Sequence, residues 1–370
     1  MSNCYVCNIE LTEENKTEEH ILLNSLGGRL KSTKLICKKC NSTFGNKIDS
    51  QLSDQFNFFA NLLMIKRDRG NPPPIRLEVK ATGDKVTVDH EGNIALLKPA
   101  VSQKKIGDET EISIQTSDIS QMKRILSGFQ KKHPSIDVDK LLASDQIRQA
   151  QIDGTLHTQL VLGGKESLPA ILKMAINYYI EITGDIQSVS SAIEDLKSND
   201  SQKVEPIFLK DRLFELDEAE VTHSIFINGD KCSRRLYAII ELFSSFQYII
   251  KLSDTYTGED YSEIYAYDVI NCAEVEKTPI NTPSHDFIFT YRYSTSKPDF
   301  SLAQESIERV VKIAMERQLS SNLDELSQKS FLNGVDPNNQ SDGVNGDVFV
   351  SELLNRLQPY LLSRLPKPNR

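Results

Sequence analysis

Four of the six cysteines stand in two pairs of identical spacing, and their arrangement is the clearest sign of chemistry in the chain. Cys4 and Cys7 form the first Cys-x-x-Cys pair, and Cys37 and Cys40 form the second. Two intervening residues let both sulfurs of a turn face one ion, so two such pairs can supply the tetrahedral ligands of a structural zinc site. Disulfides are the alternative, but they belong to oxidising compartments. We therefore predict a Cys4 zinc site and expect the isolated Cys232 and Cys272 to be buried apolar residues.

The segment between the two pairs holds a second group of reactive side chains. Glu19 directly precedes His20, a Gly27-Gly28 turn follows, and Asn41 comes immediately after the second cysteine pair. Hydrolysis of a phosphodiester needs a water nucleophile, a base to deprotonate it and a cation for the charge that develops on phosphate. His20 is a natural base because its ordinary pKa lies near neutrality. Glu19 and Asn41 offer the oxygen ligands that Mg²⁺ or Mn²⁺ prefers.

The order acidic-His, Gly-Gly and Cys-x-x-Cys-Asn, framed by another Cys-x-x-Cys, resembles the HNH endonuclease family. Within that family it is most similar to members whose ββα-metal core is held by two such cysteine pairs. The resemblance covers residues 1–50, about an eighth of the chain. It implies a hairpin followed by a helix, with Glu19 and Asn41 as ligands of the catalytic cation and His20 as general base. It also implies a DNA substrate, although the residues themselves leave RNA open.

The sequence departs from the family pattern beside the histidine. The middle Asn that orients this histidine has no clear counterpart, and Ser32 or Lys34 occupies the candidate positions. Leu23 stands where a Pro often follows the strand. Gly45 takes the place of a further His one helical turn after Asn41, which favours a Mg²⁺-type site with two protein ligands. These departures leave a weak or inactive nuclease open.

Further candidates lie on the helix that the second cysteine pair begins. Asn46 and Asp49 are alternative oxygen donors, but Asn46 is five residues from Asn41 and does not share its face. We expect Asp49, eight residues from Asn41, to be a solvated helix residue. The basic side chains that could contact phosphate need only charge and reach. They are Lys38, Lys39, Lys47 and Lys66.

Charge is unevenly distributed along the chain. The 43 basic and 52 acidic residues give a net charge of −9, which by itself argues against a nucleic-acid partner. Residues 1–70, however, hold ten basic and eight acidic side chains, so the first part is near +2 and the remainder near −11. A small basic module on an acidic body is therefore predicted. Binding of nucleic acid by the module alone should be weak and sensitive to salt.

Composition excludes several classes of protein. At 39% hydrophobic and 26% charged, the chain can bury a sizeable core. No apolar run approaches the roughly 20 residues that span a bilayer, so we expect no membrane segment. The sequence begins without the basic and apolar regions of a signal peptide, so we expect a cytoplasmic, reducing location.

Hydrophobic periodicity and Pro/Gly punctuation divide the chain into four regions. We predict a nuclease head with its zinc site and a long helix at 1–70, a strand-rich connection at 71–162, an α/β body at 163–297 and a helical region at 298–370. The predicted fold class is α+β: a small ββα-metal head stapled by zinc, then a larger mixed α/β body with a helical C-terminus. The expected strands are 75–79, 86–89, 94–97, 111–115, 156–162, 204–209, 223–228, 236–243, 248–252 and 287–293. The expected helices are 41–69 (whole or as two pieces), 120–131, 168–182, a helical stretch after 298 and 347–362, with a flexible loop at 333–343.

The leading functional hypothesis is a metal-dependent endonuclease whose body selects substrate, mediates assembly or restrains the head. By analogy with bacterial defence nucleases, it would act against phage or foreign DNA. The alternative is a zinc-stabilised nucleic-acid-binding or adaptor protein with an inactive HNH site. In a third hypothesis, without a supporting motif, the body senses a nucleotide or a phage component and the head is the effector. The body would then bind a regulatory ligand or partner protein. Cutting both strands of a duplex would require two heads, which makes a homodimer a candidate.

Overall fold

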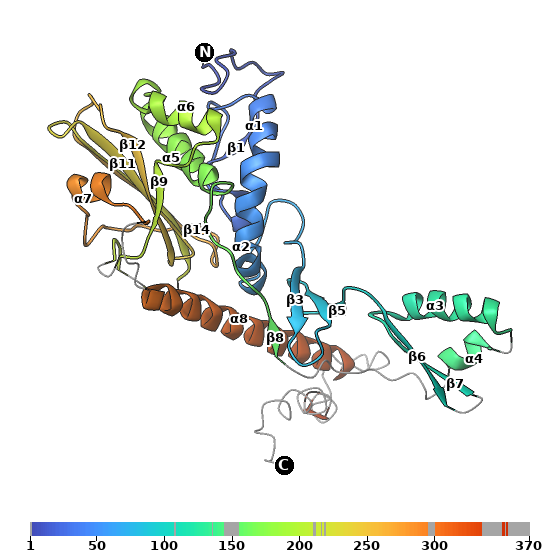
Figure 1. Cartoon of the computed structure of the whole chain (residues 1–370). Coiled ribbons are helices and arrows are strands. Elements are labelled where there is room, and N and C mark those ends of the chain that lie inside the picture. The colour runs from blue at the N-terminus through green and yellow to red at the C-terminus, as the bar shows by residue number, and fades with distance from the viewer. Residues whose placement is uncertain are drawn as a thin grey trace, which may run out of the picture.

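The computed structural model describes residues 2–106, 109–134, 136–143, 155–209, 212–215, 217, 220–294, 300–334, 350–351 and 353. Its N-terminal hairpin and helix, here called the head (residues 2–70), lie against a helix-covered sheet, the body (residues 163–294). An arm of short strands and helices (residues 75–157) projects away from both, and a long C-terminal helix runs beneath the body (Figure 1).

The head is a short hairpin followed by a long, nearly continuous helix. Strand β1 (Glu19–His20) pairs antiparallel with β2 (Lys31–Ser32), and a 3₁₀ turn η1 (Asn24–Leu26) lies between them. Helix α1 (Lys38–Phe44) continues through a π-helical segment η2 (Gly45–Asp49) into α2 (Ser50–Leu62). This hairpin-then-helix order is the ββα arrangement that the sequence predicted.

The arm contains two small antiparallel sheets. Strands β3 (Ile75–Val79), β4 (Lys85–Val88), β5 (Ile94–Leu96) and β8 (Leu156–His157) form one sheet in the order β5-β4-β3-β8. Strands β6 (Ala100–Ile106) and β7 (Glu109–Gln115) form the other. Helices α3 (Ile119–Lys132) and α4 (Val138–Leu142) follow. The arm contributes little to the main hydrophobic core, and none of its residues lines the pocket described below.

The body is built on a six-stranded sheet in the order β14-β13-β10-β11-β12-β9, in which every neighbouring pair is antiparallel. Its strands are β9 (Val204–Ile207), β10 (Thr222–Asp230), β11 (Arg235–Leu242), β12 (Phe246–Ser253), β13 (Tyr261–Asp268) and β14 (Ala273–Glu274). Its helices are α5 (Leu168–Thr183), the 3₁₀ turn η3 (Gln187–Val189), α6 (Ser190–Ser198) and α7 (His285–Thr290). Helix α8 (Phe300–Gly334) follows the body.

The two faces of this sheet pack against different partners because successive strand residues point to opposite sides. Ile225 and Ile227 of β10 belong to the large core that includes α5. Phe226 between them belongs to a second, smaller cluster, which Ile288 of α7 completes. Both faces of the sheet are therefore covered, which explains why strands β11 and β12 are buried along almost their whole length.

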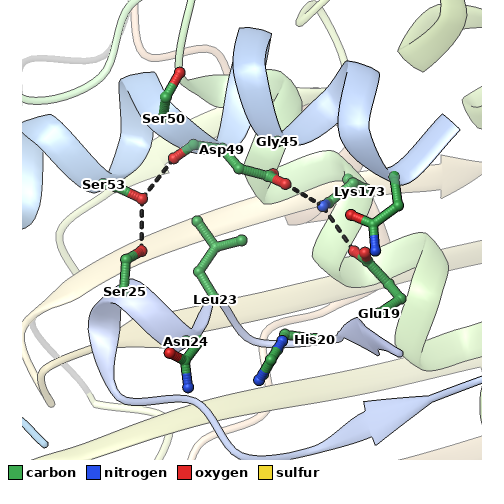
Figure 2. Close-up of a pocket in the computed structure, with 11 residues that line it drawn as sticks. Glu19, His20, Leu23, Asn24, Ser25, Gly45, Asp49, Ser50, Ser53 and Lys173 are labelled. Carbon is green, nitrogen blue, oxygen red and sulfur yellow. Dashed lines mark hydrogen bonds and ion pairs between the residues drawn. The ribbon is translucent and has the colours of Figure 1, made fainter. Parts of the chain in front are cut away.

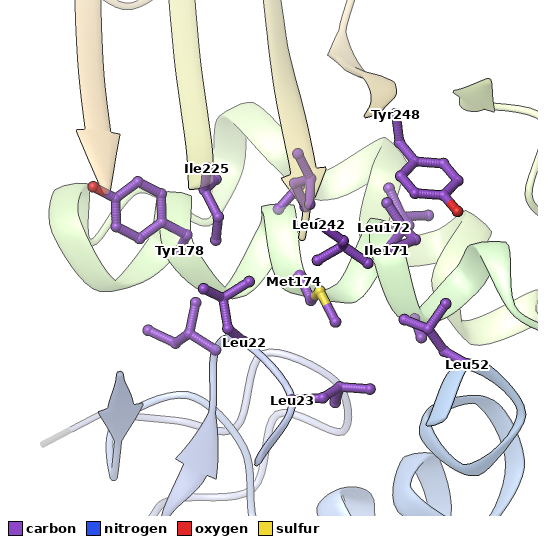
Figure 3. Close-up of a cluster of buried hydrophobic side chains, with 14 of the residues drawn as sticks. Leu22, Leu23, Leu52, Ile171, Leu172, Met174, Tyr178, Ile225, Leu242 and Tyr248 are labelled. Atoms are coloured by element: carbon purple, nitrogen blue, oxygen red, sulfur yellow. The ribbon is translucent and has the colours of Figure 1, made fainter. Parts of the chain in front are cut away.

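Helix α5 lies between the head and the sheet, and one continuous core joins all three (Figure 3). Leu22 and Leu52 of the head approach α5 from one side, opposite Ile171 and Met174. The strands of the sheet pack on its other side. Burial on both sides accounts for the apolar character of α5 all around its circumference: every residue from 168 to 180 is buried.

The structure corrects several sequence expectations. Residues 287–293, predicted as a strand, lie largely in α7, which begins after Ser284 because the Ser284 Oγ accepts the Phe287 N–H at 3.2 Å. The short helix α6 and strand β13 were not expected. Cys232 and Cys272 are exposed rather than buried. Most of the predicted helix 347–362, and all but the first two residues of the predicted loop 333–343, fall outside the described residues.

The structure also bears on membrane association. No helix among the described residues combines the length and apolar character needed to cross a membrane.

Candidate active site and zinc centre

The four paired cysteines converge at the start of the head, as predicted. Their sulfur atoms all lie within 4.8 Å of one another, and all four thiols are free. The Sγ atoms of Cys7 and Cys37 are 3.7 Å apart, and four sulfurs bound tetrahedrally at about 2.3 Å would be about 3.8 Å apart. The sulfur cluster therefore fits a metal such as zinc.

The electrostatics of the cluster favour a thiolate at Cys37. Burial raises the pKa of the Cys37 thiol, but hydrogen bonds from Cys40 and the neighbouring thiols outweigh this effect and lower it to about 7. Burial, in contrast, raises the pKa of the Cys4 and Cys40 thiols. Since the thiolate is the form that binds metal, metal binding would displace protons from the cluster. Cys37 also accepts the N–H of Asn41 through its backbone carbonyl at 2.9 Å, so the metal centre and the start of α1 are directly connected.

A pocket of about 210 Å³ opens beside this helix, between the hairpin and α5 (Figure 2). The three residues predicted to do the chemistry, Glu19, His20 and Asn41, all line it. Two further charged residues line it as well: Asp49 of the head, which was considered only as an alternative donor, and Lys173 of α5, which was not predicted. The hairpin, the helix and the body therefore all contribute to a single site.

His20 is placed and polarised by charged neighbours. Its Nε2 lies 3.1 Å from Asp68 Oδ2, and Asp68 also pairs with Arg29 and, at 2.7 Å, with Lys31. Burial, followed by the positive charge of Lys31, lowers the pKa of His20 to about 4. At neutral pH the imidazole is therefore uncharged. When Nε2 carries the proton and donates it to Asp68, Nδ1 is free to accept a proton.

Glu19 is almost completely buried, with 2% of its surface exposed. Its Oε1 accepts hydrogen bonds from Lys173 Nζ at 2.7 Å and from Asn177 Nδ2 at 3.0 Å. Asn177 in turn accepts the Tyr5 hydroxyl at 2.7 Å. Burial raises the pKa of Glu19, and the charge of Lys173 opposes that rise. This side chain is thus held by the body as much as by its own hairpin.

Asp49, expected to be solvated, instead lies in the pocket with 14% of its side chain exposed. The reason is the π-helical segment, in which the Ser50 N–H bonds to the Gly45 carbonyl five residues earlier. A π turn takes more residues than an α turn, so it brings a residue eight positions beyond Asn41 closer to the same face. Asp49 Oδ2 contacts Lys173 Nζ at 2.6 Å, and its buried Oδ1 has no hydrogen-bond partner.

Asn41 is fixed by the segment before β1. Its Nδ2 donates to Thr17 Oγ1 and to the Glu18 carbonyl, both at 3.3 Å, which leaves Oδ1 available as a ligand. Asn41 Oδ1 and Asp49 Oδ1 are hard oxygens of the kind that Mg²⁺ and Mn²⁺ bind, so the donor set fits such a cation. Among the described residues, only the four cysteines bring three or more Cys, His, Asp or Glu ligand atoms within 4.8 Å of one another. The cation site would therefore be open and completed by water.

The remaining predicted residues do not line the pocket. Ser32, a candidate for the middle Asn, is buried and donates its hydroxyl to Glu181 of α5. Lys34, the other candidate, is exposed. The candidate phosphate contacts Lys38, Lys39 and Lys47 are exposed on the outer side of the helix, and their role stays a prediction.

Three groups in the site were missed by the sequence. Asp68 carried no signal, because a single acidic residue after a helix is common. Lys173 and Asn177, in contrast, interrupt a run that is otherwise almost wholly apolar, and they are four residues apart on one helical face. A charged residue inside a fully buried helix needs a partner, so this pattern could have indicated a contact with an acidic group.

Comparison with known proteins supports the head alone. Residues 4–57 match the model of a family described as HNH endonuclease, so the resemblance in the sequence is confirmed for this segment. The matched segment contains both cysteine pairs, the hairpin and most of the long helix. No curated protein and no solved structure matches the chain.

Proposed function

We propose that the protein is a metal-dependent endonuclease that hydrolyses phosphodiester bonds of DNA. The observation that carries the proposal is the convergence of Glu19, His20, Asn41 and Asp49 around one pocket, within a segment that matches HNH endonucleases. Base, carboxylates and amide oxygen are the groups that this hydrolysis needs.

Each residue has a separate task in this proposal. His20, oriented by Asp68, accepts the proton of the attacking water at its free ring nitrogen. Asp49 and Asn41, with the second oxygen of Glu19, would hold the divalent cation. When bound, Mg²⁺ or Mn²⁺ supplies positive charge for the phosphate and the leaving oxygen. The cysteine cluster with its zinc fixes the start of α1, and so the position of Asn41.

The substrate and its context are proposed from charge and architecture. Lys38, Lys39 and Lys47 would contact the DNA backbone from the exposed side of the helix. The body would regulate or target the head, as in a cytoplasmic bacterial defence effector. A homodimer would allow both strands of a duplex to be cut.

The second candidate is a zinc-stabilised nucleic-acid-binding or adaptor protein with an inactive site. The observation that favours it is the engagement of Glu19 Oε1 by Lys173 and Asn177, which removes one oxygen from a cation. In this case the head would bind nucleic acid without cutting it.

Nicking of a supercoiled plasmid by the zinc-loaded protein distinguishes these functions. With Mg²⁺ or Mn²⁺ we expect cleavage that His20→Ala reduces by at least about a hundredfold, because a general base contributes on this scale. His157→Ala, which removes an exposed histidine of the arm, is the matched control and should cleave like the wild type. Equal cleavage by wild type and His20→Ala, or none with either metal, would contradict the nuclease assignment.

A further inference from the structure

The ammonium group of Lys173 lies between the two carboxylates of the candidate cation site (Figure 2). Its Nζ is 2.7 Å from Glu19 Oε1 and 2.6 Å from Asp49 Oδ2, and 1% of the side chain is exposed. Two buried carboxylates repel each other and need a neighbouring positive charge. Lys173 supplies that charge from a helix of the body.

Lys173 belongs to a set of polar residues that face the head along α5. Asn177, four residues on, donates to Glu19, and Glu181, four further on, accepts from Ser32. The spacing of four places all three on one face of the helix. Each contacts the hairpin or the long helix of the head, whereas the apolar residues of α5 up to Ile180 pack in the core. The body therefore reaches the site through a defined row of contacts.

We propose that Lys173 is a positioning residue that competes with the divalent cation for Glu19 and Asp49, and so sets how tightly that cation binds. The inference rests on the proposed function, since it assumes that these carboxylates serve a cation. In the metal-free protein the ammonium holds the carboxylates in place. A divalent cation on the remaining oxygens of these carboxylates binds against the repulsion of the ammonium, and it binds more tightly when that charge is withdrawn.

The charges of the two cations make them compete for these carboxylates. Mg²⁺ binds carboxylate oxygens at about 2.0–2.1 Å, closer than the Nζ contacts of 2.6 and 2.7 Å. A dication on Asp49 Oδ1 and the second oxygen of Glu19 would therefore lie on the same two carboxylates as the ammonium, within a few ångströms of it. They also repel each other strongly at such short range, because the repulsion scales with the product of the charges. Asp49 Oδ1, buried and without a partner, is the oxygen at which an entering cation can first bind.

The competition would make the body part of the catalytic device. Helix α5 is anchored in the core on both sides, so Lys173 is presented to the head by a rigid element. The concentration of divalent cation that the nuclease needs, here called its threshold, would then depend on how firmly α5 holds the Lys173 ammonium against the head. Contacts to the body that shift α5 slightly would change this threshold without touching the head.

The test compares Mn²⁺ binding to zinc-loaded full-length protein, followed by electron paramagnetic resonance at pH 8 without nucleic acid. Lys173→Gln removes the charge and keeps a hydrogen-bond donor for the carboxylates. It should lower the Kd for Mn²⁺ by at least about tenfold, because a repelling charge beside the cation is lost. Lys173→Arg keeps the charge and should bind Mn²⁺ no more tightly than the wild type. Lys203→Gln, which breaks an ion pair with Asp195 elsewhere in the body, should leave the Kd unchanged.

An unchanged or higher Kd in a folded Lys173→Gln variant would overturn the inference, and so would the absence of Mn²⁺ binding in both wild type and variant. If Lys173→Gln does not fold, the ¹⁵N resonance of the buried Lys173 ammonium is measured in the wild type instead. This resonance is assigned by its loss in Lys173→Arg. Saturating Mg²⁺ should shift that resonance, and no shift would overturn the inference. Because these measurements involve no cleavage, a failed plasmid assay would contradict the proposed function and leave the cation comparison intact.

Discussion

His20 of the hairpin and Asp68 of the segment after α2 are 48 positions apart in sequence, yet His20 Nε2 lies 3.1 Å from Asp68 Oδ2. The family resemblance offered no residue to orient this histidine, and Asp68 is the side chain that contacts its Nε2 in the structure. Arg29 and Lys31 hold Asp68 on its other sides, so the carboxylate is itself fixed. The site thus has a second layer of contacts that the motif does not contain.

The first prediction concerns this contact. Asp68→Ala should reduce the rate of plasmid nicking by about tenfold to a hundredfold, as loss of a partner that orients a catalytic group commonly does. His20 would keep its place in the chain but lose the group that fixes its ring and tautomer. Cleavage rates at saturating DNA, measured as a function of pH, are the readout.

Asp54→Asn, on the exposed side of α2, is the matched control and should cleave like the wild type. A merely structural role for Asp68 would lower thermal stability without changing the shape of the pH profile. Wild-type rates and an unchanged profile in folded Asp68→Ala would show that Asp68 does not orient His20.

The second prediction concerns the cysteine cluster. Cys37→Ser should release the metal and unfold the hairpin and α1, because a structural zinc site contributes folding free energy directly. Cys37 is 4% exposed and supports the start of α1. We expect about one zinc per wild-type chain by metal analysis, and none in the variant.

Cys232→Ser changes an exposed cysteine outside the cluster and should retain the metal and the wild-type melting temperature. Treatment of the wild type with a strong chelator should reproduce the effect of Cys37→Ser. Full zinc content in Cys37→Ser would exclude the proposed ligand set.

Local rules made the head predictable. The spacing of the cysteines indicated that the four sulfurs meet at one site. Glu19 and His20 are adjacent in sequence, and Asn41 directly follows Cys40, so their places in the head followed from the same motif. A helix at 168–182 was likewise predicted, with its apolar residues on one face. The contacts of Lys173 could not be derived in this way, because they join it to Asp49 across 124 positions of sequence. Asp49 was misjudged because helical periodicity assumes an α-helix throughout, and the π-helical segment changes the face that follows it.

The third prediction concerns the Gly-Gly turn of the hairpin. A Cβ on Gly28 would lie 2.2 Å from the Leu22 carbonyl oxygen, so the backbone itself would have to move. Gly28→Ala should therefore destabilise the protein by about 1–3 kcal/mol, the range for overpacked sites. It should also slow cleavage, because the displaced backbone follows β1 and His20.

Urea unfolding measures the first effect and plasmid nicking the second. Gly128→Ala in α3 is the control, since a Cβ there meets nothing within 4 Å. It should stabilise the protein by up to about 1 kcal/mol, as Ala replaces Gly in a helix. A neutral Gly28→Ala would mean that the turn accommodates the methyl group.

The fourth prediction uses a second buried histidine that joins the head to the sheet. His223 is fully buried, its Nδ1 accepts the Phe243 N–H at 3.0 Å, and its Nε2 donates to the Leu26 carbonyl at 2.8 Å. Only the neutral ring can make both bonds, because a protonated ring has no acceptor. Burial accordingly lowers the pKa of His223 to about 4.

Since the pKa of His223 is lower in the folded than in the unfolded chain, the unfolded chain binds more protons in mild acid. The stability that the neutral ring contributes is therefore complete above about pH 6.5 and declines as the pH falls towards 4. Between pH 7 and 4.5 the wild type should lose about 2–3 kcal/mol more of its free energy of unfolding than His223→Phe. The variant should be less stable at pH 7, because it leaves the Leu26 carbonyl and the Phe243 N–H unpaired. Urea unfolding across this range measures the difference in unfolding free energy between the two proteins. Acid effects on the zinc site and on His20 occur in both proteins, so they cancel in this difference. Parallel curves for the two proteins would show that His223 is not the group that couples protonation to the contact between head and sheet.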